Sequence, residues 1–204
     1  MIVLSGIAEK YSGDTVSDSE AFNYKSVTLK RFIEGIEKNP DGRLLDLGPV
    51  FNDNINFFSH RVKRLYICDL YRRLDEDIRD KRPPSQFSRH LDYPSETFDR
   101  ILFWDLADRL DNSHVSHIVD RCFEMITPGG IIMVLTMGDQ VSPIGRDAFI
   151  VREDFQLYLK PQAYPHLAAH YRQNRDIMHL LLPFTPLKSL IYRNGIREFL
   201  FQRD

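Results

Sequence analysis

The chain has 204 residues, 43% of them hydrophobic and 27% charged, which excludes a disordered, collagenous or fibrous protein. Its 27 Lys and Arg against 29 Asp and Glu give a net charge of −2, and this balance argues against a nucleic-acid partner. No apolar run approaches the ~20 residues that span a bilayer, and the start lacks the basic region of a signal peptide. With only two cysteines, we expect a cytoplasmic protein of one domain that contacts no membrane.

The first two thirds of the chain alternate between helical and extended patterns. A helical pattern over 19–38 ends at Asn39-Pro40-Asp41-Gly42, which has the composition of a turn. Short apolar runs then predict strands at 43–47, 64–68, 86–90, 100–104 and 131–136. Helical spacing of apolar residues predicts helices over 52–62 and 113–126, and the charged stretch 71–81 is predicted to form a short solvated helix. This alternation is typical of a parallel sheet with helices on both faces.

The pattern changes after Met137. Residues 138–152 are predicted to form a loop, and a helical region is predicted over 153–182. Asn194-Gly195 separates two apolar runs, 187–193 and 196–202, and predicts an antiparallel hairpin because both turn positions favour positive φ.

Three segments resemble class I S-adenosylmethionine-dependent methyltransferases. Leu44-Leu45-Asp46-Leu47-Gly48 resembles the first motif, in which a strand runs into a glycine loop. Residues 91–99 resemble the segment that leads into the fourth strand, and Pro128-Gly129-Gly130 resembles the turn before the fifth. The resemblance covers residues 41–204.

The resemblance implies an α/β fold whose seven-stranded, mostly parallel sheet carries helices on both faces and ends in an antiparallel hairpin. An N-terminal helical extension precedes it. We expect one methyltransferase-like domain over 1–204, divided into a helical cap (1–40), a Rossmann-like cofactor-binding half (41–137), and substrate-side helices with the hairpin (138–204).

Ligands of an open parallel sheet bind at the carboxyl ends of its strands. Gly48 falls at such an end and would let the backbone approach a ligand closely, and Asp69 could accept both hydroxyls of a ribose. The resemblance implies S-adenosylmethionine as cosubstrate, with an acid at the position of Asp69 for its ribose. The cofactor-binding candidates are Asp46, Gly48, Pro49, Asp69, Leu70, Asp92 and Trp104.

Asp105 is the catalytic candidate, as a base for an acceptor that must lose a proton. A plainer interpretation stays open for each acid: Asp105 and Asp69 could cap the turns that follow them, and Asp46 could pair with a backbone amide. His114 and His117 share a helix face without a third ligand, so we expect no metal site. The polar and aromatic stretch 164–176 could form an acceptor pocket, a solvated face or a dimer contact.

The glycine loop departs from the family pattern. Val50 and Asn52 stand where further glycines are expected, Pro49 lacks a backbone donor, and Phe51 is bulky. Two functions therefore compete: methyl transfer to a small molecule or protein side chain, and a catalytically inactive binding or scaffolding role. A dehydrogenase is disfavoured, since no Gly-x-Gly-x-x-Gly follows the first strand. The acceptor and homodimer formation are left open.

Overall fold

The computed structural model describes residues 2–4, 23–137, 147–162 and 164–204, and it has a mixed α/β fold with two sheets. The strands are β1 (Ile2–Leu4), β2 (Asn23–Lys25), β3 (Arg43–Asp46), β4 (Arg64–Ile67), β5 (Phe98–Trp104), β6 (Ile126–Thr136), β7 (Asp147–Arg152), β8 (Gln156–Pro161), β9 (Thr185–Ile191) and β10 (Arg197–Gln202). The α-helices are α1 (Val27–Glu37), α2 (Asn52–Ser59), α3 (Leu70–Arg79), α4 (Leu106–Arg109), α5 (Asn112–Met125) and α6 (Asn174–Leu180), and the 3-10 helices are η1 (Pro84–Leu91) and η2 (Glu153–Phe155).

The main sheet has the strand order β1-β4-β3-β5-β6-β10-β9. Neighbours from β1 to β6 are parallel, whereas β10 is antiparallel to both β6 and β9. The sheet is therefore mixed rather than purely parallel: its parallel part runs from β1 to β6, and its antiparallel part is the hairpin β9–β10. Six of the predicted strands lie in it, and the hairpin is confirmed.

The predicted strand at 86–90 is wrong. These residues belong to the 3-10 helix η1, which begins at Pro84, and Phe87 and Leu91 are buried side chains of this helix. The outer place beside β4 is instead taken by β1 from the start of the chain.

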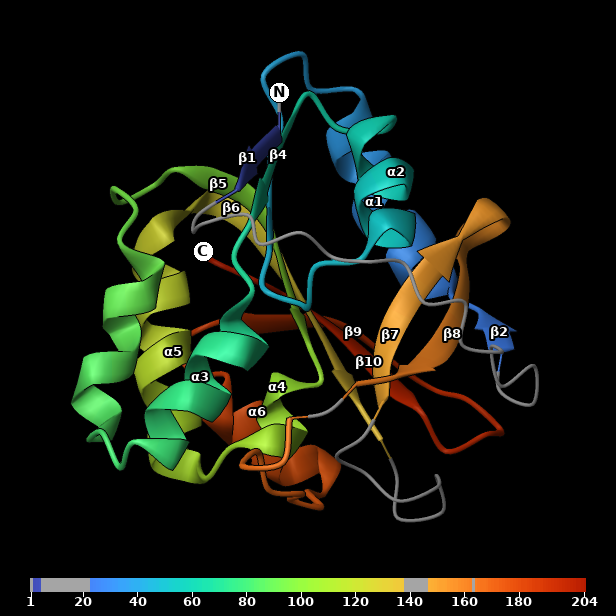
Figure 1. Cartoon of the computed structure of the whole chain (residues 1–204). Coiled ribbons are helices and arrows are strands. Elements are labelled where there is room, and N and C mark those ends of the chain that lie inside the picture. Colours follow the sequence, from blue (N-terminus) through green and yellow to red (C-terminus); the bar gives the residue numbers. More distant parts are fainter. Residues whose placement is uncertain (1, 5–22, 138–146, 163) are drawn as a thin grey trace.

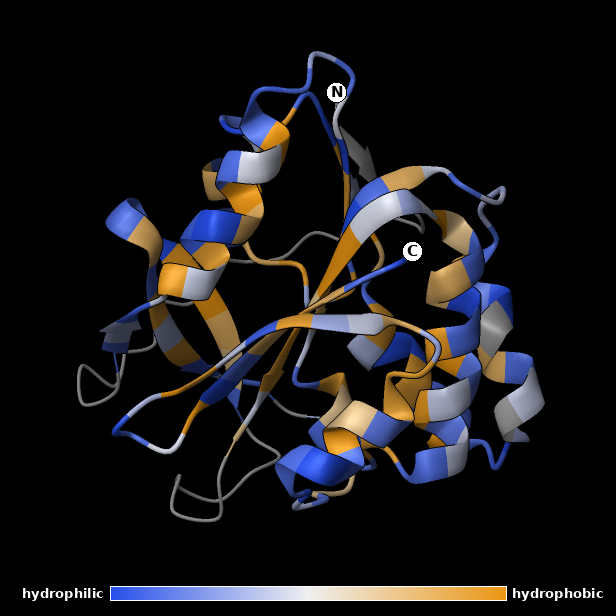
Figure 2. Cartoon of the chain, turned by 180° about the vertical axis from the view of Figure 1, so that it is seen from behind, coloured by the Kyte–Doolittle hydropathy of each residue, from blue (hydrophilic) through white to orange (hydrophobic). Residues whose placement is uncertain are grey.

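Helices cover both faces of the main sheet, as expected. In Figure 1, α1 and α2 lie on one side of it, and α3, α5 and α6 lie on the other. The apolar stripe predicted for the helix over 113–126 is buried in α5, with Val115, Ile118, Val119 and Cys122 among its inward residues. Figure 2 shows hydrophobic residues along the central strands and hydrophilic ones on the outer turns of the helices.

A second sheet, of order β2-β8-β7, was not predicted. The helical region expected over 153–182 is wrong at Gln156–Pro161, where β8 buries Leu157 and Leu159 with the period of a strand. Among the later described residues of this region, α6 is the one helix. In the predicted loop, residues 138–146 lie outside the described residues, and the rest form β7. The first helix begins at Val27 rather than Ser19, after its N-cap Ser26; residues 19–22 also lie outside the described ranges.

The β9–β10 connection differs in detail from the predicted turn. Gly195 has a φ of 85°, whereas Asn194 is not among the residues of positive φ. The side chain of Asn194 instead accepts a hydrogen bond from the Ile196 amide at 3.1 Å. Among the described residues, every helix is too short or too polar to cross a bilayer.

Candidate functional site

The carboxyl ends of β3, β4 and β5 meet at one edge of the main sheet. The chain leaves β3 toward β4 on one side, and it later returns to β5 on the other. Backbone hydrogen bonds join the three strand ends: the Cys68 amide donates to the Asp46 carbonyl, and the Leu47 amide donates to the Leu102 carbonyl. This is the topological switch point, where open sheets bind ligands.

The first candidate, Asp46, lies buried at the end of β3. Its Oδ1 accepts hydrogen bonds from the Gly48 amide at 2.8 Å and from the indole Nε1 of Trp104 at 2.6 Å. Burial raises the pKa of Asp46 to about 6, although both hydrogen bonds favour the charged form. The structure thus joins three of the candidates through one carboxylate oxygen.

The indole of Trp104 fills the space beside Gly48. A Cβ added to Gly48 would lie 2.5 Å from the indole Nε1, so the close approach that this glycine permits is used by a side chain of the same protein. Phe149 of β7 stacks on the indole with ring centres 6.2 Å apart. Trp104 is 2% exposed and has a left-handed φ of 53°, which costs a non-glycine residue conformational energy.

The loop after Gly48 is covered by the second sheet. Pro49 is buried, and Phe51 packs against Ala148 and Ile150 of β7. The bulky ring of Phe51 therefore points into the β7–β8 hairpin.

Asp69 and Leu70 stand where β4 passes into α3. Asp69 is the N-cap of this helix, since its side chain accepts a hydrogen bond from the Arg72 amide at 3.3 Å. It is 6% exposed, and burial raises its pKa against the opposing effect of Arg72. Leu70 is fully buried beneath it. The capping interpretation is thus observed, and it leaves other lone pairs of the carboxylate for a ligand.

Asp105 lies just after β5 and is fully buried. Its Oδ1 accepts the hydroxyl of Tyr71 at 2.5 Å, and its Oδ2 accepts Arg109 Nε at 2.8 Å. Burial, together with the nearby Asp105 charge, raises the pKa of Tyr71 well above its ordinary value. Both carboxylate oxygens of this catalytic candidate are therefore engaged by groups of the protein.

Asp92 is not brought to the other candidates. It is exposed in the loop that leads into β5, and it lines a separate cleft with Arg121 and Glu124 of α5.

Sequence reasoning did not predict that two charged residues around α4 are buried, although one of them, Arg172, lies in the stretch 164–176 named as a possible acceptor pocket. Asp108 of α4 accepts a hydrogen bond from the Met137 amide at 2.6 Å, and burial raises its pKa to about 7. Arg172 donates to the backbone oxygens of Ala107 and Leu110 at the end of the same helix. The Asp105-x-x-x-Arg109 spacing was a usable signal for the neighbouring ion pair, but nothing local indicates that Arg172 points inward.

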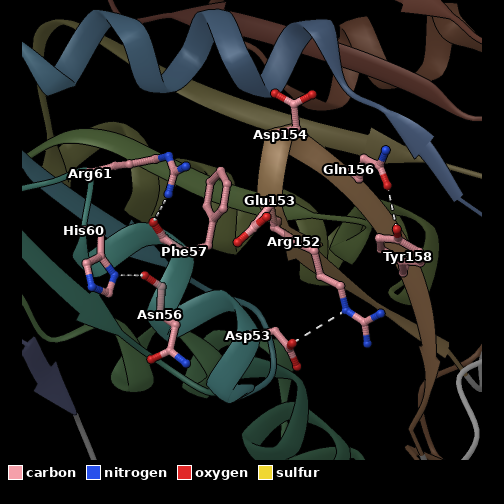
Figure 3. A pocket seen from close by; sticks show the side chains of 11 residues that line it. Asp53, Asn56, Phe57, His60, Arg61, Arg152, Glu153, Asp154, Gln156 and Tyr158 are labelled. Atoms are coloured by element: carbon pink, nitrogen blue, oxygen red, sulfur yellow. Dashed lines mark hydrogen bonds and ion pairs between the residues drawn. The ribbon is translucent and has the colours of Figure 1, made fainter.

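A cleft of about 850 Å³ opens between α2 and the β7–β8 hairpin, away from the switch point. In Figure 3, Asp53 lies 3.7 Å from Arg152, and Arg61 donates to the Phe57 carbonyl at 2.9 Å. None of the predicted site residues lines it.

No family model and no curated protein matches the sequence. Among solved structures, an S-adenosylmethionine-dependent methyltransferase from Mesorhizobium loti aligns with a TM-score of 0.53 and 13% identity, over 84% of this chain and 100% of that chain. The 1,6-didemethyltoxoflavin-N1-methyltransferase of Burkholderia thailandensis, solved with 1,6-didemethyltoxoflavin and S-adenosylhomocysteine, aligns with a TM-score of 0.48 and 15% identity, over 87% of this chain and 79% of that one. At such identities the likeness to the Mesorhizobium protein establishes the methyltransferase fold alone.

Proposed function

We propose that the chain binds S-adenosylmethionine at the carboxyl ends of β3, β4 and β5, and transfers its methyl group to a small molecule or a protein side chain. The observation that carries this proposal is the meeting of Asp46, Gly48 and Asp69 at the switch point of the sheet. The likeness to the Mesorhizobium methyltransferase supports the fold on which the proposal rests. A cytoplasmic location is part of the same proposal.

Asp69 is the residue that we propose to hold the ribose. Its carboxylate already caps α3, but a carboxylate has about four acceptor positions, so it can also receive a diol. We propose that Leu70 and the Gly48-Pro49 loop also contact the cosubstrate. Asp92 is left out because it lines a different cleft.

Asp69 and Gly48 differ in how well they suit S-adenosylmethionine. The acid at the end of β4 suits a nucleoside. At Gly48, the indole of Trp104 occupies the space that the missing side chain leaves. We therefore propose that Trp104 must move when the cosubstrate binds. Rotation of the side chain would move the indole without changing the left-handed φ of its backbone.

When bound, the cosubstrate supplies a methyl group on a sulfonium, which is a good leaving group, so alignment with the acceptor provides most of the acceleration. The chain then has to hold and shield the reactants rather than carry protons. We propose a positioning role for Asp105, which fixes the turn after β5 through Tyr71 and Arg109. Service as a base would require one of these hydrogen bonds to open.

A second candidate is the catalytically inactive binding protein. The enclosure of Trp104 by Asp46, Gly48 and Phe149 favours it specifically, because a buried indole that is hydrogen-bonded and stacked is costly to displace.

The test is calorimetric titration of the purified chain with S-adenosylmethionine and with S-adenosylhomocysteine, followed by methyl-transfer assays with labelled donor. A parallel titration uses Trp104→Gly, which keeps the left-handed backbone and removes the indole; its thermal melt verifies that it folds. Binding by the wild type, with label transfer to an acceptor, supports the enzyme. Binding by the variant alone favours the inactive protein. Absence of binding by both, with the variant folded, contradicts a donor site.

A further inference from the structure

A third cleft, of about 730 Å³, lies between the start of α5 and α6 with the segment that precedes it. Its lining mixes cationic, imidazole and aromatic side chains from the segment before α6 and from α6 itself. The residues are Asn112, Ala169, His170, Tyr171, Arg172, Arg175, Asp176, His179 and Leu180. The function proposed above makes no use of it.

The floor of this cleft carries a buried cation. Arg172 is 8% exposed, and its guanidinium donates to the Ala107 carbonyl, to the Leu110 carbonyl at 2.7 Å and to the Asn112 side-chain oxygen at 2.8 Å. All three acceptors are neutral, and burial lowers the pKa of Arg172. Its positive charge is thus solvated by dipoles and not neutralised by contact with a carboxylate, which leaves a favourable potential for an anion.

Asp108, Asp111 and Asp176 act on the Arg172 charge electrostatically, but among the described residues none of them forms an ion pair with its guanidinium. The Asp176 carboxylate accepts the Gln173 amide at 3.0 Å in the capping box of α6. Asp111 lies 2.6 Å from Nδ1 of His114. Asp108, which burial brings to a pKa of about 7, is partly neutral at physiological pH. Each of these acids therefore has its nearest partner elsewhere, and together they offset only part of the Arg172 charge from a distance.

The rim adds further positive or protonatable groups. Arg175 and His179 lie one helical turn apart on α6, both exposed, and His170 precedes them. Within the part of the chain that the structure describes, Arg175 makes no ion pair. Tyr171 is 57% exposed beside them and offers an aromatic surface next to the cations.

We propose that this cleft binds a small aromatic molecule bearing an oxyanion, a carboxylate or a phosphate. The oxyanion accepts charge-assisted hydrogen bonds from the exposed Arg175, the buried charge of Arg172 attracts it from the floor of the cleft, and the ring packs on Tyr171. The argument is independent of the methyl donor, so the site can be tested whether or not S-adenosylmethionine binds.

The experiment titrates the whole chain with benzoate and with phenyl phosphate, followed by calorimetry and by NMR of backbone amides. Benzamide, a neutral isostere of benzoate, is the ligand control. Because Arg172 supports α4, the test variant is Arg175→Gln on the exposed rim. Arg193→Gln, at an exposed arginine of the β9–β10 connection, is the matched protein control.

We expect at least one of the two anions to bind about tenfold more tightly than benzamide, with amide shifts at residues 169–180. Arg175→Gln should weaken that anion by about threefold to tenfold, and Arg193→Gln should leave it unchanged. Equal binding of benzamide, equal effects of the two variants, or no shifts at residues 169–180 would each overturn the proposal.

Discussion

The indole Nε1 of Trp104 lies 2.6 Å from Oδ1 of Asp46, and this contact joins the ends of β3 and β5. The same oxygen accepts the Gly48 amide, so one buried carboxylate organises the centre of the candidate site. Trp104→Phe should lose the indole donor and lower the free energy of unfolding by about 1–3 kcal/mol. Urea denaturation measures it, and the loss should shrink when Asp46 is already replaced by Asn; additive losses would argue against the coupling.

Gly48 should tolerate no side chain while the indole is present. An added Cβ would lie 2.5 Å from Trp104 Nε1, so Gly48→Ala should lower the free energy of unfolding by about 1–3 kcal/mol. In a Trp104→Ala background the same substitution should cost clearly less, because the clashing atoms are gone. Thermal or urea denaturation of the four proteins gives both values, and equal costs in the two backgrounds would show that the indole is not the obstacle.

Asp69 allows its capping role to be separated from the proposed ribose contact. Asp69→Ser keeps a good N-cap but has no carboxylate, whereas Asp69→Ala loses both. If the proposed donor site exists, both variants should weaken S-adenosylmethionine binding by about 1–3 kcal/mol. Only Asp69→Ala should also lose about 1 kcal/mol of stability. Calorimetry and thermal denaturation report the two effects, and unchanged affinity of a folded Ser variant would exclude the ribose role.

Asp108 should make stability depend on pH. Burial raises its pKa from 3.8 to about 7, so the folded state binds the proton more tightly than the unfolded state. Stability should therefore fall as pH rises from about 4 through about 7. Asp108→Asn should remove much of this slope. The free energy of unfolding of the variant minus that of the wild type should be at least about 1 kcal/mol larger at pH 8 than at pH 5. Urea denaturation at both values measures it. Asp46, whose pKa is also raised, to about 6, accounts for the pH dependence that remains in the variant. The control is Asp120→Asn, at an exposed position.

Asn54 connects α2 to the second sheet. Its buried side chain donates to the Phe149 carbonyl at 3.2 Å and accepts the Val151 amide at 2.8 Å. Asn54→Ala should destabilise the chain by about 2–3 kcal/mol, since two backbone groups of β7 lose their partner. The exposed Asn56→Ala on the same helix should change stability by less than about 0.5 kcal/mol. Comparable effects in denaturation experiments would contradict this role.

The sequence predicts those parts of the fold that depend on local periodicity. The stripe from Val115 to Met125 has helical spacing and is buried as a helix. The wrong assignments fall where local pattern is weak. Leu157 and Leu159 alternate over too few residues to distinguish a strand from a helix, and their partners in β2 and β7 supply what decides between them. The strand β1 is set entirely by its distant pairing with β4.

The candidate site was predictable in position but not in contacts. Strand ends located Asp46, Gly48, Asp69 and Trp104, because the ends of parallel strands meet at one edge. That the Trp104 indole would reach Asp46 across the sheet, or that Arg172 would turn inward beneath α4, depends on side-chain packing between distant segments. No spacing in the sequence encodes those contacts.

The antiparallel position of β10 also has a consequence for the order in which the sheet can be completed. During synthesis the amino-terminal elements emerge first, yet β6 receives its second neighbour only when Arg197–Gln202 has been made. Until then the backbone of β6 presents an open edge, the kind of surface on which nascent chains pair wrongly or recruit chaperones. A chain truncated before Arg197 would therefore keep this open edge and be prone to aggregation.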